Sequence, residues 1–157
     1  MRRKLVGVVA VLATLGGVGG AIALGSEGTI TAPETIRLDA RGGQIAFLFL
    51  NPNKHTAFGD QIVVKQSAFT RGTKDRVGRV HAVCTFMDKK GGAADCTGTV
   101  FLPDGSIFFT GPVHFEVNDR TAGGVTGGSG RYRNARGQVV LINRKSGSEG
   151  FIFQLEP

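Results

Sequence analysis

The chain has 157 residues, 25 glycines and a formal net charge of +7. This length suits one domain, and glycines spread between apolar runs without a period exclude a collagen-like repeat. Three of the 19 basic residues lie in the first four positions, and the remaining 16 against 12 acidic residues leave +4. The basic clusters at 71–76 and 131–136 are not interleaved with several aromatic residues. We therefore expect no nucleic-acid partner.

The first 23 residues are typical of an export signal. Three basic residues precede an apolar run over 5–24, and Ala21 and Ala23 form a small-x-small cleavage pattern, with Gly25 as a second cleavage point. An uncleaved membrane anchor is the alternative, because about 20 apolar residues span a bilayer. We predict a secreted protein with a signal peptide over 1–23, no membrane contact after its removal, a flexible segment over 24–34 and one domain over 35–157.

After this leader, short runs rich in Val, Ile, Phe and Thr alternate with turn-forming residues and show no helical period. About eight evenly spaced strands with short connections predict a sandwich or an up-and-down barrel. The predicted strands cover residues 35–39, 44–50, 61–70, 77–87, 95–102, 106–117, 138–144 and 150–155, with a further extended piece around 125–132. The fold class that we expect is all-β, a closed eight-stranded antiparallel barrel.

A predicted turn over 89–92 sets the register of the strands on either side of it. Pairing about Lys90 places Cys84 opposite Cys96. Directly opposed residues have Cβ atoms about 4.5–5.5 Å apart, which is close to disulfide reach. Two cysteines in an exported chain predict one disulfide. A free thiol in the pocket is the alternative.

The Asp104-Gly105 pair predicts a second hairpin, in which Leu102 pairs with Ile107. Both registers separate one apolar face from one mostly polar face, which suits a barrel with an apolar lumen. The predicted lumen face carries Val80, Ala82, Cys84, Phe86, Cys96, Val100, Leu102, Ile107, Phe109, Val113 and Phe115. Phe101 and Phe108 are apolar exceptions on the polar face, and a contact between copies in a homo-oligomer would explain them.

An ordered set of motifs between Gly59 and Val139, about half of the chain, resembles the allene oxide cyclase barrel family, which includes the plant dirigent proteins at greater distance. The matching pieces are Gly59-Asp60, Val77-Gly78-Arg79, Cys84, Gly111-Pro112, Val125-Thr126-Gly127-Gly128-Ser129-Gly130, Tyr132, Ala135 and Gly137-Gln138-Val139. The resemblance implies a calycin-like barrel with an elongated apolar pocket. Family members hold a flexible hydrophobic substrate there, so that shape and a few polar groups select one ring closure.

Carried over residue by residue, the resemblance places apolar pocket positions on Ile62 and Val64, a pocket amide on Gln66 and a pocket cysteine on Cys84. A lone amide on a dry face needs a partner, which a ligand can supply. Plant members also carry a pocket acid on the strand that corresponds to 44–50, and this chain has none there. The predicted ligand contacts are Ile62, Val64, Gln66, Val80, Ala82, Cys84, Val100, Phe109 and Arg136.

Two of the singled-out residues have alternative interpretations. Asp60 is either a strand-start residue or an acid catalyst. Arg136 matches a dirigent-like motif, and a salt bridge at the barrel rim would equally explain it. The glycines Gly127, Gly128 and Gly130 are predicted to serve a barrel corner, because no helix follows them to make a phosphate site.

The predicted function is binding of a small hydrophobic molecule in the lumen, with cofactor-independent promotion of its cyclisation or isomerisation. Gln66 and Asp60 are the catalytic candidates. A non-catalytic guiding or carrier protein is the alternative, and a structural protein without a usable pocket is a third. His55, His81 and His114 show no spacing for a metal or a nucleophile–base pair, so no metal site is expected.

Overall fold

The computed structural model describes residues 29–50, 58–88, 90 and 92–157. The predicted signal peptide over 1–23, His55 and residues 24–28 of the predicted segment over 24–34 lie outside the described residues. In the described part of that segment, Ile30 is buried in the core, whereas Thr31, Ala32 and Pro33 are exposed. No helix in the described part of the chain is long and apolar enough to cross a membrane.

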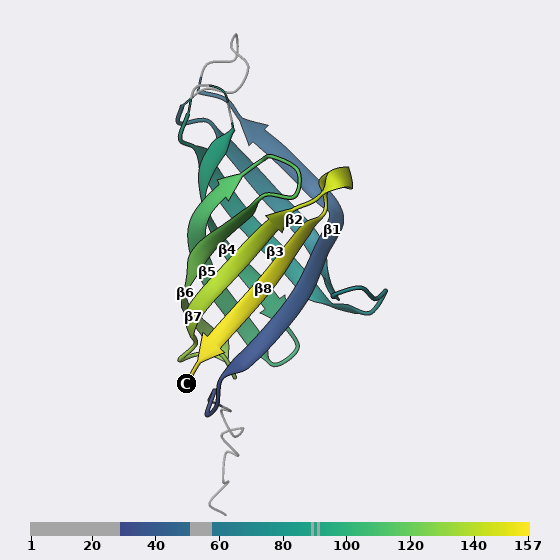
Figure 1. The fold of residues 1–157 in the computed structure, drawn as a ribbon, viewed down its shortest axis with the longest axis vertical. Coiled ribbons are helices and arrows are strands. Elements are labelled where there is room, and N and C mark those ends of the chain that lie inside the picture. The colour runs from purple at the N-terminus through teal and green to yellow at the C-terminus, as the bar shows by residue number, and fades with distance from the viewer. Residues whose placement is uncertain (1–28, 51–57, 89, 91) are drawn as a thin grey trace, which may run out of the picture.

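The predicted closed antiparallel barrel is confirmed, and its eight strands follow one another in chain order around the wall (Figure 1). The elements are β1 (Glu34–Leu48), β2 (Gln61–Thr70), β3 (Arg76–Phe86), β4 (Ala93–Leu102), β5 (Gly105–His114), β6 (Arg120–Gly130), β7 (Arg136–Asn143), the 3-10 turn η1 (Lys145–Gly147) and β8 (Glu149–Glu156). Pairing of β8 with β1 closes the sheet. Buried and exposed residues alternate along most strands, as expected when one face lines a lumen.

The prediction of separate strands over 35–39 and 44–50 was wrong. One strand, β1, runs through both, and a bulge between Arg41 and Gly43 absorbs the glycines between them. Gly42 and Gly43 have φ values of +63° and +117°, which a residue with a Cβ rarely adopts. Conversely, β6 is a full strand from Arg120, where only an extended piece around 125–132 was expected.

The two predicted registers had different outcomes. Cys84 pairs with Cys96 as expected. The second register was wrong by two residues, because Leu102 pairs with Gly105 around a Pro103-Asp104 loop. The fixed φ of Pro103 suits the first position of this two-residue loop. The residue after the loop, Gly105, has a φ of +145°. A slip of two residues leaves every side chain on its predicted face.

A disulfide joins Cys84 to Cys96, as predicted. Titration of the unfolded, unreduced protein should therefore find no free thiol, and two free thiols would contradict the bridge. Replacing both cysteines by alanine should lower the free energy of unfolding by about 2–4 kcal/mol, because the unfolded chain loses its cross-link. Urea unfolding of the variant measures this difference.

The barrel interior has a filled half and a hollow half. In the filled half, Phe109, Phe151 and Phe153 pack with ring centroids 5.6–6.1 Å apart. Tyr132 and Ala135, from the turn between β6 and β7, are buried in the same cluster. The hollow half has a second apolar cluster, which includes the disulfide. Val113 packs against both clusters. Phe109, from the filled half, also lines the cavity in the hollow half, so this ring limits how far the cavity extends into the barrel.

Gly98 makes room for Phe109, because a Cβ on this glycine would lie 2.3 Å from Cζ of the ring. The variant Gly98→Ala should lose about 1–3 kcal/mol of unfolding free energy through overpacking. Gly124→Ala is the matched control, since nothing lies within 4 Å of the added Cβ. It should change stability by less than about 0.5 kcal/mol. Equal losses of unfolding free energy in the two variants would show that the loss comes from replacing any strand glycine, and that contact with Phe109 does not cause it.

The glycine-rich stretch has the structural role that was predicted for it. Gly127 and Gly130 have φ values of +144° and +57°. Gly128 packs against backbone, because its Cβ would lie 2.3 Å from the carbonyl oxygens of Ser106 and Tyr132. These contacts shape the end of β6 and the turn that follows, at the filled end of the barrel.

Candidate functional site

An apolar cavity of about 160 Å³ lies in the hollow half of the barrel. Six of the nine predicted ligand contacts line it, namely Ile62, Val64, Gln66, Ala82, Cys84 and Phe109. The other three do not. Val80 and Val100 are buried in the filled half, and Arg136 is exposed at the first position of β7, next to Glu156. The cavity therefore brings together the predicted contact residues of β2 and the end of β3 that carries the disulfide.

The elongated pocket expected from the family resemblance is not formed by the described residues. Phe109 and Phe151 line the inner end of the cavity and belong to the filled core. A cavity of about 150 Å³ holds a molecule the size of benzene. The space behind Gln66 is therefore large enough for one ring and too short for a long coiled chain.

Gln66 is the buried amide that the alternation of β2 predicted, with 4% of its surface exposed. Its Nε2 donates a hydrogen bond to the carbonyl oxygen of Gly147 at 3.2 Å. This bond ties β2 to η1 and fixes the amide group. The Oε1 atom is buried and accepts no hydrogen bond from the described residues. An unpaired buried acceptor costs about 1–3 kcal/mol, and a ligand that donates to it removes this cost.

Glu149 places a carboxyl group in the wall of the cavity. It is the first residue of β8, on the same face as Phe151, and it lines the cavity. Burial raises the pKa of the Glu149 carboxyl above its ordinary value. A neutral carboxyl group can donate a hydrogen bond or a proton to an oxygen of a ligand.

The sequence reasoning missed Glu149 because the acid was sought at its family position on another strand. The signal was present in the alternation of β8, where the lumen-facing residues Phe151, Phe153 and Leu155 continue back to position 149. Asn143 lines the cavity beside it and pairs with it across the ladder between β7 and β8. Its side-chain amide donates to the carbonyl oxygen of Glu116 at 3.2 Å.

The disulfide forms part of the cavity wall, since both Cys84 and Cys96 line it. The chain has no other cysteine. The alternative interpretation of Cys84 as a free pocket thiol is therefore wrong, and the cavity holds no thiol nucleophile.

Asp60 lies outside the cavity and holds the chain where β2 begins. Its carboxylate accepts a hydrogen bond from the backbone N–H of Leu50 at 2.7 Å, and its carbonyl oxygen accepts one from the N–H of Phe86 at 2.9 Å. The residue is 1% exposed. These contacts agree with the strand-start interpretation, whereas a catalytic acid would have to reach the lumen.

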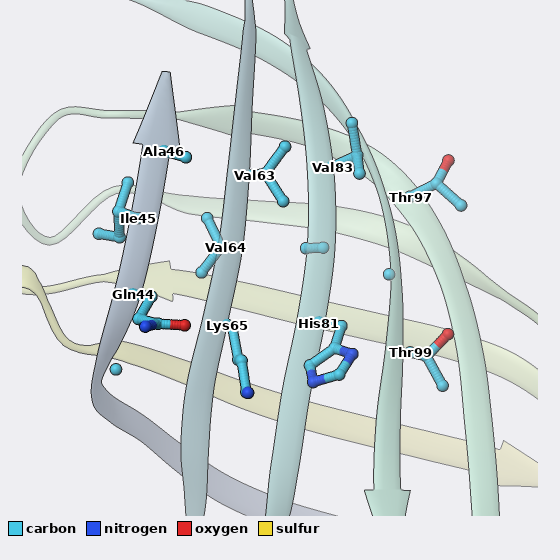
Figure 2. A pocket seen from close by; sticks show the side chains of 13 residues that line it. Gln44, Ile45, Ala46, Val63, Val64, Lys65, His81, Val83, Thr97 and Thr99 are labelled. Carbon is cyan, nitrogen blue, oxygen red and sulfur yellow. The ribbon is translucent and has the colours of Figure 1, made fainter. Parts of the chain in front are cut away.

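A larger and open hollow of about 920 Å³ lies on the outer face of β1–β4 (Figure 2). Figure 2 shows Gln44, Lys65, His81 and Thr99 in a row across the four strands, as their pairing requires. Burial, together with the charges of Arg79 and Lys65, lowers the pKa of His81. Sites for small molecules bury most of the ligand. We therefore favour the enclosed lumen over this open face as the binding site.

Within the described residues, no three His, Cys, Asp or Glu side chains gather to form a metal site. His114 pairs with Asp119 at 2.8 Å, and this pair is exposed at the hollow end of the barrel. Hydrogen bonds from the Arg120 backbone and the His114 ring lower the pKa of Asp119.

No protein-family model and no curated protein matches the chain. Among solved structures, it is similar to a pyocyanin demethylase (22% identity, TM-score 0.67), covering 78% of this chain and 100% of the other. It is also similar to the pterocarpan synthase dirigent protein PsPTS1 (13% identity, TM-score 0.62), covering 80% and 94%. The Diels Alderase AbmU from Streptomyces koyangensis matches at 14% identity and TM-score 0.61, covering 79% and 63%. These likenesses establish the barrel fold.

Proposed function

We propose that this barrel binds a small, largely apolar molecule in its lumen and promotes cyclisation or isomerisation of that molecule. The observation that carries the proposal is the presence of Gln66 and Glu149 in a cavity whose other lining is apolar apart from Asn143, whose amide already donates to the carbonyl oxygen of Glu116. Gln66 offers an acceptor without a partner in the described chain, and Glu149 offers a carboxyl group whose pKa is raised by burial.

In this proposal, the two groups have complementary roles. The Glu149 carboxyl donates to an oxygen on the ligand and stabilises charge that develops there during ring closure or bond migration. The Gln66 Oε1 accepts from a hydroxyl or N–H group and orients the ligand. The apolar walls exclude water and restrict the conformers that a bound molecule can adopt. No cofactor is needed for this chemistry.

Two kinds of observation support the proposal. The similar structures include one named a Diels Alderase and one named a pterocarpan synthase dirigent protein. The disulfide and the export-signal pattern over 1–23 fit a site of action outside the cytoplasm. A guiding or carrier protein without catalysis is the second candidate, since dirigent proteins are among the similar structures.

Native mass spectrometry with a panel of small aromatic, unsaturated lipid and polyketide compounds separates these candidates. A retained ligand that chromatography shows to be converted into an isomer of equal mass supports the enzyme, and a ligand retained unchanged supports the carrier. Gln66→Leu should weaken retention about tenfold, because a hydrogen bond of about 1–1.5 kcal/mol is lost. Gln44→Leu, on the outer face, is the matched control. Retention of no compound by the native protein would overturn the proposal.

A further inference from the structure

The second half of β1 lies at a gap in the barrel wall. β1 and β8 pair only as far as Ala40 and Glu149, and beyond the bulge residues 43–48 pair with β2 alone. Figure 1 shows β1 continuing past the start of β8 toward the hollow end of the barrel. Within the part of the chain that the structure describes, one edge of this half-strand therefore has no strand beside it.

Two apolar side chains at this gap point to the cavity side and are still half exposed. Ile45 pairs with Val64 and Phe47 pairs with Ile62, so each shares a face with a buried cavity residue. Ile45 is 52% exposed and Phe47 is 50% exposed, whereas their partners are 6% and 8% exposed. The lumen face of β1 thus continues out of the barrel as apolar surface.

This surface is continuous with the cavity. Ile45 lines the cavity and also reaches solvent, so the cavity opens at this residue, across the gap from Glu149. Phe49 extends the surface, since its ring lies parallel to that of Phe47 with centroids 5.9 Å apart. We call Ile45, Phe47 and Phe49 the apolar strip.

The cavity and the strip differ in what they can hold. The cavity has room for one ring and contains the two polar groups, whereas the strip is apolar and lies outside. A hydroxyl group on a ring can donate to the Gln66 Oε1 and accept from Glu149 at the same time. A ligand that uses both parts therefore has a polar aromatic end and an apolar end.

We propose that cavity and strip form one binding site for a phenol-like amphiphile, with its hydroxyl-bearing ring in the cavity and its apolar substituent lying on the strip. This inference rests on the proposed function, because it requires that the cavity binds a ligand. It adds the chemical class of that ligand and the path by which it enters. A second copy of the chain covering the strip is the competing occupant, and the experiment below distinguishes the two.

The test is calorimetric titration of the full chain with 4-alkylphenols from 4-methylphenol to 4-hexylphenol. Each added methylene should lower Kd about two- to threefold, as expected for a chain that leaves water for an apolar surface. Phe47→Ser should remove most of this dependence and leave the Kd of 4-methylphenol unchanged. Leu48→Ser is the control, because Leu48 is equally exposed at 53% but points to the opposite face of β1.

The outcomes separate this inference from the proposed function. If 4-methylphenol binds and loses affinity in Gln66→Leu, but longer chains bind no better, the proposed function stands and the inference is wrong. Equal loss of chain-length dependence in the two serine variants would also overturn the inference. The inference would also be wrong if sedimentation shows that Phe47→Ser dissociates an oligomer while the dependence of Kd on alkyl chain length persists. If no alkylphenol binds, the inference is wrong, and the proposed function then stands only if the native protein retains another compound of the panel described above. If alkylphenols bind equally well to Gln66→Leu, both proposals fail.

Discussion

Replacing Phe109 by alanine should lower the free energy of unfolding by about 3–5 kcal/mol, the usual cost of removing a fully buried phenylalanine. The ring is 1% exposed and packs edge-on against Phe151 and Phe153. It also covers Gly98, which has no side chain to fill the vacated space. Urea unfolding of the purified variant measures the loss.

The same variant should change which ligands fit, because Phe109 lines the inner end of the cavity. Its removal joins the cavity to space in the filled half, so Phe109→Ala should bind a rigid two-ring phenol such as 4-phenylphenol deep in the lumen. Phe108→Ala is the control, since Phe108 is on the outer face and 39% exposed. It should cost less than about 1 kcal/mol. Equal costs for the two variants would contradict the division into a filled and a hollow half.

Changing Glu149 to glutamine should weaken phenol binding about tenfold at acidic pH, because a carboxyl donor of about 1–1.5 kcal/mol is replaced by a weaker one. The native protein should also lose affinity as pH rises above the ordinary value of 4.5 and through the raised pKa of Glu149. Ionisation removes the donated proton and places a negative charge beside the ligand oxygen. The affinity of Glu149→Gln should show no such decline.

The stability of the protein should follow the same titration. A carboxyl whose pKa is raised on folding binds its proton more tightly in the folded state. Its stabilising contribution is complete below the unfolded pKa and is lost as pH rises through the folded pKa. The native protein should therefore lose stability relative to Glu149→Gln as pH rises from about 4.5. Glu156→Gln is the control, because this residue ends the same strand and is exposed. Parallel pH profiles for native protein and Glu149→Gln would contradict a raised pKa of the Glu149 carboxyl.

The alternation of residues along each strand predicted the barrel wall better than it predicted the cavity and the residues inside the barrel. Alternation along β2–β5 was enough to assign lumen faces, and these faces held even where the register at Pro103-Asp104 slipped by two. The register error left the predicted faces unchanged because every second side chain along a strand points to the same face. By contrast, two separate strands were predicted on either side of the Gly42-Gly43 pair, although the pair forms a bulge in a continuous strand. A glycine pair permits either conformation, and only pairing with β2 on one side and β8 on the other decides between them.

The candidate site was predicted in part for the same reason. Gln66 stood out as the polar residue within an alternating apolar run, so local pattern found it. The size of the cavity depends on Phe109 and Phe151, which come from distant strands and meet only in the closed barrel. Glu149 was missed because the acid was sought on the strand over 44–50, although the alternation of β8 continues back to position 149.

A crystal structure with bound 4-bromophenol tests the central claim most directly, because bromine can be located by its anomalous scattering. We expect the ring inside the lumen, its hydroxyl within hydrogen-bond distance of the Gln66 Oε1 and the Glu149 carboxyl, and the bromine directed toward Ile45. An empty lumen with bromine only in the outer hollow beside Lys65 and His81 would contradict it.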